Sequence, residues 1–369
     1  MVVNTVAAAA QRLPIGVDEQ GRLPLPWLAD ALTRAQALDR AHALLLCGPA
    51  GAGHLELGLL LAQRWLCESA GARGAIGVVQ HPCGHCASCH LVRTRVHPDL
   101  LVVVPDALRV ALGWADEDGI ASKSEAKPSR DVRVEQVRQA IAWSQQTSGR
   151  GRGKFLLLHP ADALNGPAAN ALLKTLEEPP GQLHMVLTSV DPELLLPTVR
   201  SRCQRLPLGL PDAAEATEWL AARGISDSGA LLALAGGSPM EALDLAAEGI
   251  DAAWISAAPA RIAAGDAQPL RGRPIPRVVD LLTKLAHDGM AVSVAGPPRY
   301  FPAQALVPVE DASAWVAWQR VLVRTARHED HPWNAALLIE SLVTQASAAW
   351  PGMKVRRTTR ASASLHSAR

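Results

Sequence analysis

Cysteines at short, regular spacing are the first feature of this 369-residue chain that could do chemistry. The segment HPCGHCASCH carries Cys83, Cys86 and Cys89, and with Cys67 upstream the spacing is C-x15-C-x2-C-x2-C. Each Cys-x2-Cys turn can bring two thiolates onto one ion, and four thiolates complete a tetrahedral zinc site with no position open for a substrate. The spacing therefore predicts a structural Zn²⁺ site held by Cys67, Cys83, Cys86 and Cys89.

The fourth ligand is open from the sequence, because three nearby histidines could replace Cys67: His81, His85 and His90. We find no export signal ahead of the cluster, so its cysteines are more typical of a metal site than of a disulfide framework. Free thiols are the simpler alternative. Cys47 and Cys203 lie far from the cluster in sequence, and we expect them to be small buried apolar residues.

A second feature, the segment GPAGAGHL at Gly48–Leu55, has the glycine spacing of a phosphate-binding P-loop, G-x-x-x-x-G-K-[ST]. The backbone amides of such a loop close around phosphates at a helix N-terminus. Here Gly48 and Gly53 are in place, but His54 replaces the lysine and Leu55 replaces the hydroxyl that binds Mg²⁺. Without both groups the loop cannot pair with the β- and γ-phosphates or hold the metal. A strand and a helix flank it, so we interpret it as a degenerate P-loop and not as an ordinary glycine-rich turn.

The segment KFLLLHPADAL, Lys154–Leu164, shows a second loss of the same chemistry. In a working nucleotide-binding domain of this kind, the end of such a strand carries an acidic pair that binds Mg²⁺ and polarises the attacking water. His159 and Pro160 stand at that place in this chain. Two separate elements therefore lack the groups that ATP hydrolysis needs.

The elements that would position these residues alternate between strands and helices. Short apolar runs predict buried strands at Ala41–Cys47, Leu100–Val104, Lys154–Leu158 and Met185–Thr188. Helices are predicted from the P-loop through Leu66, at Val134–Ser144, at Asn165–Glu178 and at Pro192–Val199. The polar segment Asp106–Arg130 has no periodicity and is predicted to be a mobile loop. This alternation indicates a parallel sheet with helices on both faces.

Composition favours a helix-rich protein with more than one domain. The chain is 49% hydrophobic and 4% aromatic, with a formal net charge of +1. That charge does not favour nucleic-acid binding over the whole surface. The most apolar stretch, Leu44–Leu66, is interrupted by glycines and polar residues, so we expect no membrane segment and a cytoplasmic location.

Three further motifs make a resemblance specific. They are LLKTLEEPP at Leu172–Pro180, TSVDPELLLPTVRSRC at Thr188–Cys203 and GGSPMEAL at Gly236–Leu243. With the glycine-rich loop and the cysteine set, they resemble the clamp-loader branch of the AAA+ family, which includes gamma/tau, delta-prime and replication factor C subunits. Delta-prime subunits keep the fold and the zinc module but lose the ATP site, and this chain matches that pattern. Active members typically carry an arginine where Met240 stands. The resemblance is clear over 24–245 and weak over 246–350.

The sequence and the resemblance together predict a domain organisation. The sequence itself predicts a weakly ordered N-terminal extension at 1–23 and a basic disordered tail at 351–369, and the resemblance covers neither. Between them the resemblance implies a degenerate AAA+ α/β domain at 24–210 with the zinc module at 67–89, a small helical lid at 211–250 and an all-α collar or oligomerisation domain at 251–350.

The resemblance also implies a function and a role for Arg202. Such a subunit binds no ATP and joins gamma/tau and delta in a hetero-pentamer, a component of the DNA polymerase III holoenzyme that loads the β sliding clamp onto primed DNA. The Ser-Arg-Cys arginine of one subunit reaches the ATP of its neighbour, where its planar, permanently charged guanidinium suits a γ-phosphate. Arg202 is therefore the expected catalytic residue, acting in trans. Thr188 falls where active members place a polar sensor, and we expect it to be structural here.

Two other classes of function compete with this interpretation. A catalytically active motor subunit of the gamma/tau type is disfavoured by five positions: His54, Leu55, His159, Pro160 and Met240. A zinc knuckle that binds nucleic acid needs basic and aromatic residues around the cysteines. Around Cys83, Cys86 and Cys89, only Arg93 and Arg95 lie close by in sequence, and no aromatic residue does.

Overall fold

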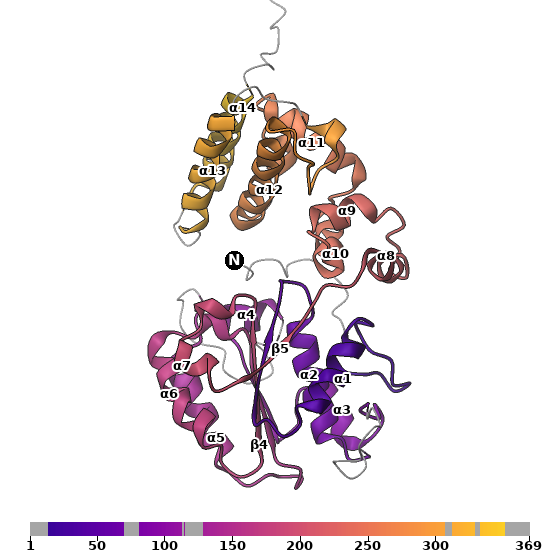
Figure 1. Ribbon diagram of the computed structural model, residues 1–369, viewed down its shortest axis with the longest axis vertical. Helices are drawn as coiled ribbons and strands as arrows, with labels where there is room; N and C mark the ends of the chain where they lie inside the picture. The colour runs from indigo at the N-terminus through magenta and orange to yellow at the C-terminus, as the bar shows by residue number, and fades with distance from the viewer. Residues whose placement is uncertain are drawn as a thin grey trace, which may run out of the picture. The chain divides into compact units, whose positions relative to one another are not determined.

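A parallel β-sheet is the centre of the N-terminal region (Figure 1). The computed structural model describes residues 14–69, 81–112, 114, 128–306, 312–328 and 333–350. Within these residues the strands are β1 Ala43–Cys47, β2 Leu100–Val103, β3 Lys154–Leu158, β4 Leu183–Ser189 and β5 Gln204–Pro207. They lie in the order β2-β3-β4-β1-β5, and every neighbouring pair is parallel. The predicted parallel sheet is confirmed.

The apolar runs form strands because both faces of the sheet are covered. All residues of β3 are buried, including Lys154, whose Nζ lies 4.1 Å from the centre of the Trp143 ring. Sequence analysis missed β5, since Gln204, Arg205 and Pro207 are exposed and only Leu206 is buried. This strand lies at the edge of the sheet, where a proline is tolerated.

Helices cover both faces of the sheet (Figure 1). One side carries α1 Leu28–Ala37, α2 His54–Leu66 and α3 Ala87–Arg93. The other carries α5 Val134–Ser144, α6 Gly166–Glu177 and α7 Pro197–Arg200. The side chain of Asn165 caps α6 by accepting a hydrogen bond from the Ala168 amide at 2.9 Å. Residues Leu172 and Leu176 of this helix pack, fully buried, against Leu158 and Leu187 of the strands.

Three local predictions are wrong. Pro192–Val199 is not one helix: a 3-10 turn, η2 Pro192–Leu194, is followed by extended residues and then by α7. Pro197 explains the break, because a proline disfavours helical backbone in the residue before it. The polar segment 106–130 begins with a helix, α4 Asp106–Ala111, whose first residue is acidic and so interacts favourably with the helix dipole. Residues 113 and 115–127 of that segment lie outside the described residues.

The third error concerns the N-terminal extension. Residues 14–23 were expected to be weakly ordered, but Val17 is fully buried. Its amide donates a 2.7 Å hydrogen bond to Oε1 of Gln63, which is itself fully buried in α2. Residues 1–13 lie outside the described residues, as does the predicted tail at 351–369.

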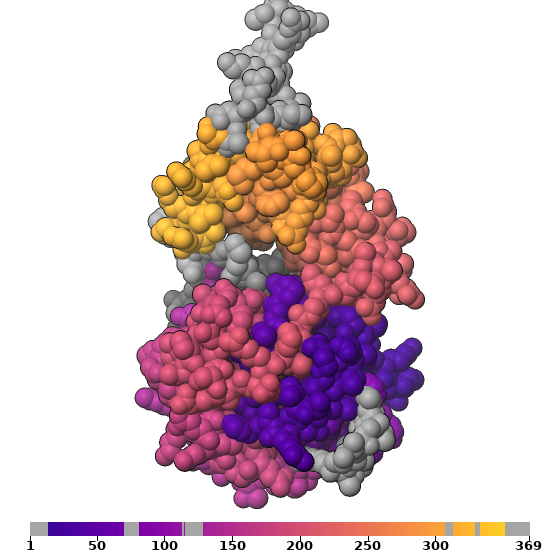
Figure 2. All heavy atoms as spheres, in the orientation of Figure 1, coloured from indigo at the N-terminus to yellow at the C-terminus, as the bar shows by residue number. Residues whose placement is uncertain are grey.

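Figure 2 shows the indigo N-terminal residues against the rose-coloured residues that follow β5, and Arg34 of α1 donates to the Pro207 carbonyl at 3.0 Å.

The rest of the described chain is helical apart from its connecting loops. The helices are α8 Ala213–Ala221, α9 Gly229–Leu234, α10 Pro239–Ala247, α11 Ala252–Ala263, α12 Ile275–Ser293, α13 Ala312–Ala326 and α14 Ala335–Ala349. Two compact units divide the chain. One contains the sheet and extends to Ser228, with Gly237–Glu248 added, and the other contains Gly229–Gly236 and the chain from Gly249 onward. The lid and collar boundaries at 210 and 250 stay a prediction.

Tryptophan packing forms the core of the second unit. The ring of Trp315, from α13, is fully buried and makes edge contacts with Trp318 and Trp350, at centroid distances of 5.4 and 4.3 Å. Gly289 of α12 lets the helices approach, since a Cβ atom there would lie 2.6 Å from the Trp315 ring. Among the described residues, no helix is long and apolar enough to cross a membrane.

Candidate functional site

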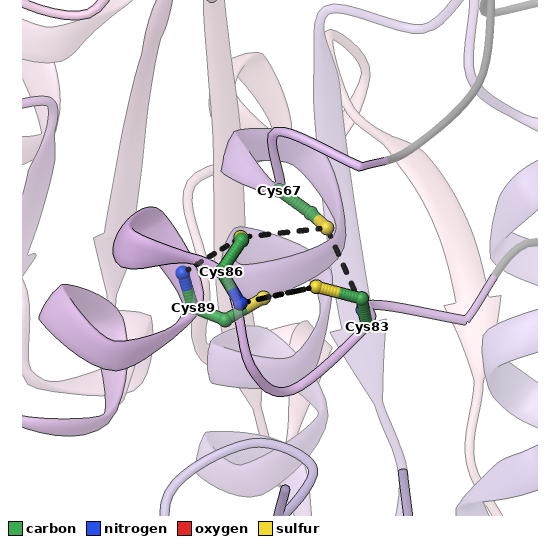
Figure 3. A group of neighbouring side chains, drawn as sticks. All are labelled: Cys67, Cys83, Cys86 and Cys89. Atoms are coloured by element: carbon green, nitrogen blue, oxygen red, sulfur yellow. Dashed lines mark hydrogen bonds between the residues drawn. The ribbon is translucent and has the colours of Figure 1, made fainter.

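The structure brings together the predicted cysteines, Cys67, Cys83, Cys86 and Cys89 (Figure 3). Cys67 directly follows α2, and Cys83 lies in the turn that leads to α3. Cys86 caps α3, and its sulfur accepts a hydrogen bond from the Cys89 amide at 3.4 Å. Two further backbone amides donate to sulfur, Cys83 to Cys67 at 3.5 Å and Cys86 to Cys83 at 3.3 Å. Such bonds stabilise thiolates.

The geometry of the sulfurs fits a tetrahedral zinc ion. All four lie within 4.8 Å of one another, and the Cys67–Cys86 and Cys83–Cys89 pairs are each 3.9 Å apart. Zn–S bonds of about 2.3 Å at tetrahedral angles require sulfurs ~3.8 Å apart. The hydrogen bond between the two thiols lowers the pKa of Cys67 and raises that of Cys89, so in the absence of an ion Cys67 is the one of the pair that favours the thiolate form.

The three histidines proposed as alternative ligands do not join this cluster. His81, His85 and His90 are all exposed. His85 directs Nδ1 to the carbonyl of Cys83 at 2.8 Å. Among the described residues, the group that could hold a metal is the set of four cysteines.

A polar network that sequence analysis missed joins the cysteine cluster to the loop before β3. Arg150 of this loop donates from Nε to the Ser88 hydroxyl at 3.0 Å and forms an ion pair with Glu68. Arg152 donates to the Glu68 carbonyl at 2.7 Å. Ser88 lies between two cluster cysteines and Glu68 directly follows another. Their position beside the cysteines was the one indication in the sequence that Glu68 and Ser88 belong to the site. Nothing in the sequence near residues 150 and 152 identifies these two arginines as their partners.

The degenerate P-loop lies between β1 and α2. Gly53 caps α2 in a left-handed conformation, with φ at 96°, which only glycine adopts at low cost. Gly51, at φ 80°, faces Ser238, whose hydroxyl would lie 2.0 Å from a Cβ atom at that position. Ser238 is buried and caps α10 by accepting from the Glu241 amide at 3.1 Å. The loop is therefore packed against the GGSPMEAL motif of the same chain.

His54 lies in the first turn of α2, where the P-loop lysine would be. Its side chain is buried, and its Nε2 has no hydrogen-bond partner among the described residues. Burial lowers the pKa of His54 to about 4, against a smaller opposing effect from Asp162. The ring is therefore uncharged at neutral pH.

His159 lies at the end of β3, where the acidic pair would be. Desolvation, helped by His54, lowers the pKa of His159 to about 3. Its Nδ1 lies 2.7 Å from the hydroxyl of Thr188 in β4. Nearby, Asp162 accepts a hydrogen bond from the Val190 amide at 2.9 Å and another from the Ser189 hydroxyl. The positions of the phosphate lysine and the first metal-binding acid are thus held by two neutral imidazoles.

Arg202 follows α7, which lies on the other side of the sheet from α2 and α3 and their cysteines. Its Nε donates to Oε1 of Glu177 at 2.8 Å, and its Nη1 donates to the Thr198 carbonyl at 2.8 Å. The side chain keeps 32% of its surface exposed. The side chain is thus held by two contacts but is not buried.

Comparisons with known proteins identify relatives of this chain. Residues 28–211 match the family described as DNA polymerase III, delta subunit. DNA polymerase III subunit delta' of Pseudomonas aeruginosa is 40% identical over 217 residues, 58% of this chain and 58% of that protein. The Escherichia coli subunit of the same name is 32% identical over 227 residues, 60% of each chain. DNA polymerase III subunit tau of E. coli is 32% identical over 186 residues, 50% of this chain and 24% of that protein.

The parallel sheet, the glycine-rich loop and the matches to delta' and tau define a protein related to the AAA+ clamp-loader subunits. More closely, residues 28–211 are similar to the DNA polymerase III delta-subunit family, and the chain has relatives among the delta' subunits. The matched regions span about six-tenths of the length of these two delta' relatives, 58% and 60%.

Proposed function

We propose that this chain is a delta-prime-type subunit of the DNA polymerase III clamp loader. It neither binds nor hydrolyses ATP, and it supports the ATP-driven loading of the β sliding clamp onto primed DNA. Its partners are gamma/tau and delta in a hetero-pentamer, and a cytoplasmic location goes with this role. The lid at 211–250 and the collar at 251–350 belong to the same proposal, with the collar holding the subunits together.

One observation carries the proposal: two neutral imidazoles lie where an active subunit needs a cation and an acid. A P-loop lysine pairs with the phosphates through its charge, whereas His54 has a pKa of about 4 and is uncharged at neutral pH. His159, with a pKa of about 3, is also uncharged and cannot hold Mg²⁺ as a carboxylate would. Leu55 offers no hydroxyl to the metal. The family match supports the rest of the assignment.

Zinc has a structural role in this proposal. Cys67, Cys83, Cys86 and Cys89 would hold the ion, and four thiolates leave no position for a substrate or a water nucleophile. When bound, the ion cross-links the end of α2 to the start of α3. The ion pair of Glu68 with Arg150 then connects this module to the loop before β3.

Arg202 would act in trans on ATP held by a neighbouring gamma/tau subunit. A planar guanidinium presents N–H donors in a fixed fork that matches phosphate oxygens, and its charge balances the charge that builds up during phosphoryl transfer. Two observations support this role. The Arg202 side chain is partly exposed, and the neutral His54 leaves this chain without a phosphate-binding cation at its own loop, so Arg202 would have no nucleotide of its own chain to act on.

Reconstitution tests the proposal. The chain should form a stable complex with gamma/tau and delta, and this complex should load the β clamp onto primed DNA, whereas the complex lacking the chain should not. The isolated chain should show no ATPase activity. ATP hydrolysis by the isolated chain would indicate the motor-subunit alternative, and tight DNA binding lost with the cysteines would indicate the zinc-knuckle alternative.

A further inference from the structure

Glu177 and Arg202 meet although they are 25 residues apart in the sequence. Oε1 of Glu177 accepts from Nε of Arg202 at 2.8 Å and also from Nη2 of the same side chain. On the other side, Nη1 of Arg202 donates to the carbonyl of Thr198 at 2.8 Å. The guanidinium is therefore held at two edges by one carboxylate oxygen and one backbone carbonyl.

Both anchors are fixed to the core. Glu177 is the last residue of α6, and its neighbour Leu176 is fully buried. Thr198 belongs to α7, and its neighbour Val199 is also fully buried. Because α6 and α7 pack against each other, the backbone positions that carry the two anchors are fixed relative to one another. Arg202 is thus held between two rigid elements although it lies at the surface.

The unused donors of Arg202 form a phosphate-binding edge. A guanidinium has five N–H groups. The contacts with Glu177 and Thr198 use one on Nε, one on Nη2 and one on Nη1. One N–H group on each terminal nitrogen remains, apart from a long 3.4 Å contact of Nη1 with the Ser201 hydroxyl. These two groups belong to the two terminal nitrogens, which together form one of the guanidinium edges that can bind two phosphate oxygens.

We propose that Glu177 is a positioning residue for Arg202. This proposal rests on the role in trans that is proposed above for Arg202. The carboxylate holds the Nε edge and so orients the free edge toward the ATP of the neighbouring subunit. A mobile arginine would lose side-chain freedom each time it met the phosphate, and pre-positioning removes that loss before the reaction. Glu177 is 49% exposed, so its ion pair contributes little to folding stability and its main effect is on orientation.

A latch is the competing interpretation of the same contact. In that case the carboxylate would neutralise Arg202 and compete with the phosphate, and removing it would free the guanidinium. The two interpretations predict changes of opposite sign in the ATPase rate. The two interpretations also predict different ATPase rates for Glu177→Gln. In this variant the amide oxygen still accepts hydrogen bonds from the two N–H groups of Arg202, but it carries no charge.

The test uses the full loader, assembled with gamma/tau subunits of which only the one beside this chain has a working ATP site. The variants are Glu177→Ala, Glu177→Gln, Arg202→Ala and the double alanine variant, with Glu178→Ala as the matched control on the same helix end. Glu177→Ala should lower kcat of the clamp- and DNA-stimulated ATPase by about tenfold, less than the ~10³-fold expected for losing an arginine finger, with little change in KM. Glu177→Gln should retain most of the rate, and Glu178→Ala all of it.

The double variant should be no slower than Arg202→Ala alone, because Glu177 acts through that residue. A faster ATPase in Glu177→Ala would establish the latch and overturn the proposal. An unchanged rate, or an equal loss when Arg202 is already alanine, would overturn it as well. If Arg202→Ala itself had no effect, the proposed trans role would fail, and that outcome is distinct from failure of Glu177 alone.

Discussion

Nδ1 of His159 lies 2.7 Å from the hydroxyl of Thr188, so a hydrogen bond joins the ends of β3 and β4. Thr188 is buried, and the pKa of His159 is lowered to about 3, chiefly by desolvation. In an active relative these two strand ends would present a metal-binding acid and a free polar sensor. Here the two side chains bind each other, which fits the proposed loss of the nucleotide site.

The isolated chain should not bind ATP with micromolar affinity in the presence of Mg²⁺, as isothermal titration can measure. Substituting His54→Lys should not restore binding, because Leu55, His159 and Met240 remain. The new ammonium would occupy a buried position that already disfavours a charged imidazole, so this variant should also be less stable than the parent. Recovery of Mg²⁺-dependent binding by this single change would refute this account of the loop.

Stability should fall as the pH is lowered from about 6.5 toward 4, because of His54. An unfolded imidazole takes up a proton near pH 6.5, whereas folded His54 does so only near its pKa of about 4. The unfolded state therefore binds more protons across this window, and acidification favours it. Over this pH window, His54 should lower the free energy of unfolding by about 2–3 kcal/mol, and His54→Gln should abolish that decrease. Urea denaturation at several pH values measures both.

The exposed His328 provides the control for this experiment. His328→Gln should follow the pH dependence of the parent. Protonation of the cysteine cluster affects all variants alike, so only the difference between the two glutamine variants matters. Parallel curves for His54→Gln and His328→Gln would show that His54 does not titrate as its burial implies.

About one zinc ion per chain should be found in protein purified without added zinc. Cys86→Ser should lose the metal and lower the melting temperature, because closed thiolate sites contribute directly to folding. Cys203→Ala should keep the zinc, since Cys203 is buried elsewhere and belongs to the other helical layer. Retention of full zinc by Cys67→Ser, together with its loss on changing His81, His85 or His90, would show that the fourth ligand is a histidine.

Gly289→Ala should destabilise the second compact unit. The added Cβ atom would lie 2.6 Å from the ring of Trp315, which is fully buried and cannot move aside. Overpacking of this kind costs about 1–3 kcal/mol, which exceeds the roughly 1 kcal/mol that alanine gains over glycine in a helix. Gly229→Ala is the control, since open space surrounds that helical position. Chemical denaturation should show a loss only for Gly289→Ala, and equal stability of the two variants would contradict this packing.

Strands buried on both faces were predictable because most of their own residues are apolar. Lys154–Leu158 was predicted with the bounds that the structure shows. β5 was not predictable, since Gln204 and Arg205 are polar and the strand forms only by pairing with β1. The helix predicted over Pro192–Val199 followed the apolar pattern and overlooked the effect of Pro197 on its neighbour.

The candidate sites divide in the same way. Cys67, Cys83, Cys86 and Cys89 could be grouped from spacing, because a zinc site imposes a regular pattern on the sequence. The contact between Glu177 and Arg202 could not be predicted, since it depends on how α6 packs against α7. Local patterns thus identified residues with a chemical signature, whereas partnerships between distant surface residues required the tertiary structure.

The most direct test of the central claim is the ATPase and clamp-loading rate of a loader reconstituted with Arg202→Ala. Arg202→Lys should be nearly as damaging, because an ammonium lacks the fork geometry, and the exposed Arg205→Ala should serve as control. We predict normal folding, zinc content and assembly, a fall of about 10³-fold at the neighbouring ATP site, and a larger loss of loading than of total ATPase. Normal clamp loading by Arg202→Ala would contradict the account, and loss of assembly would make Arg202 an interface residue and not a catalytic one.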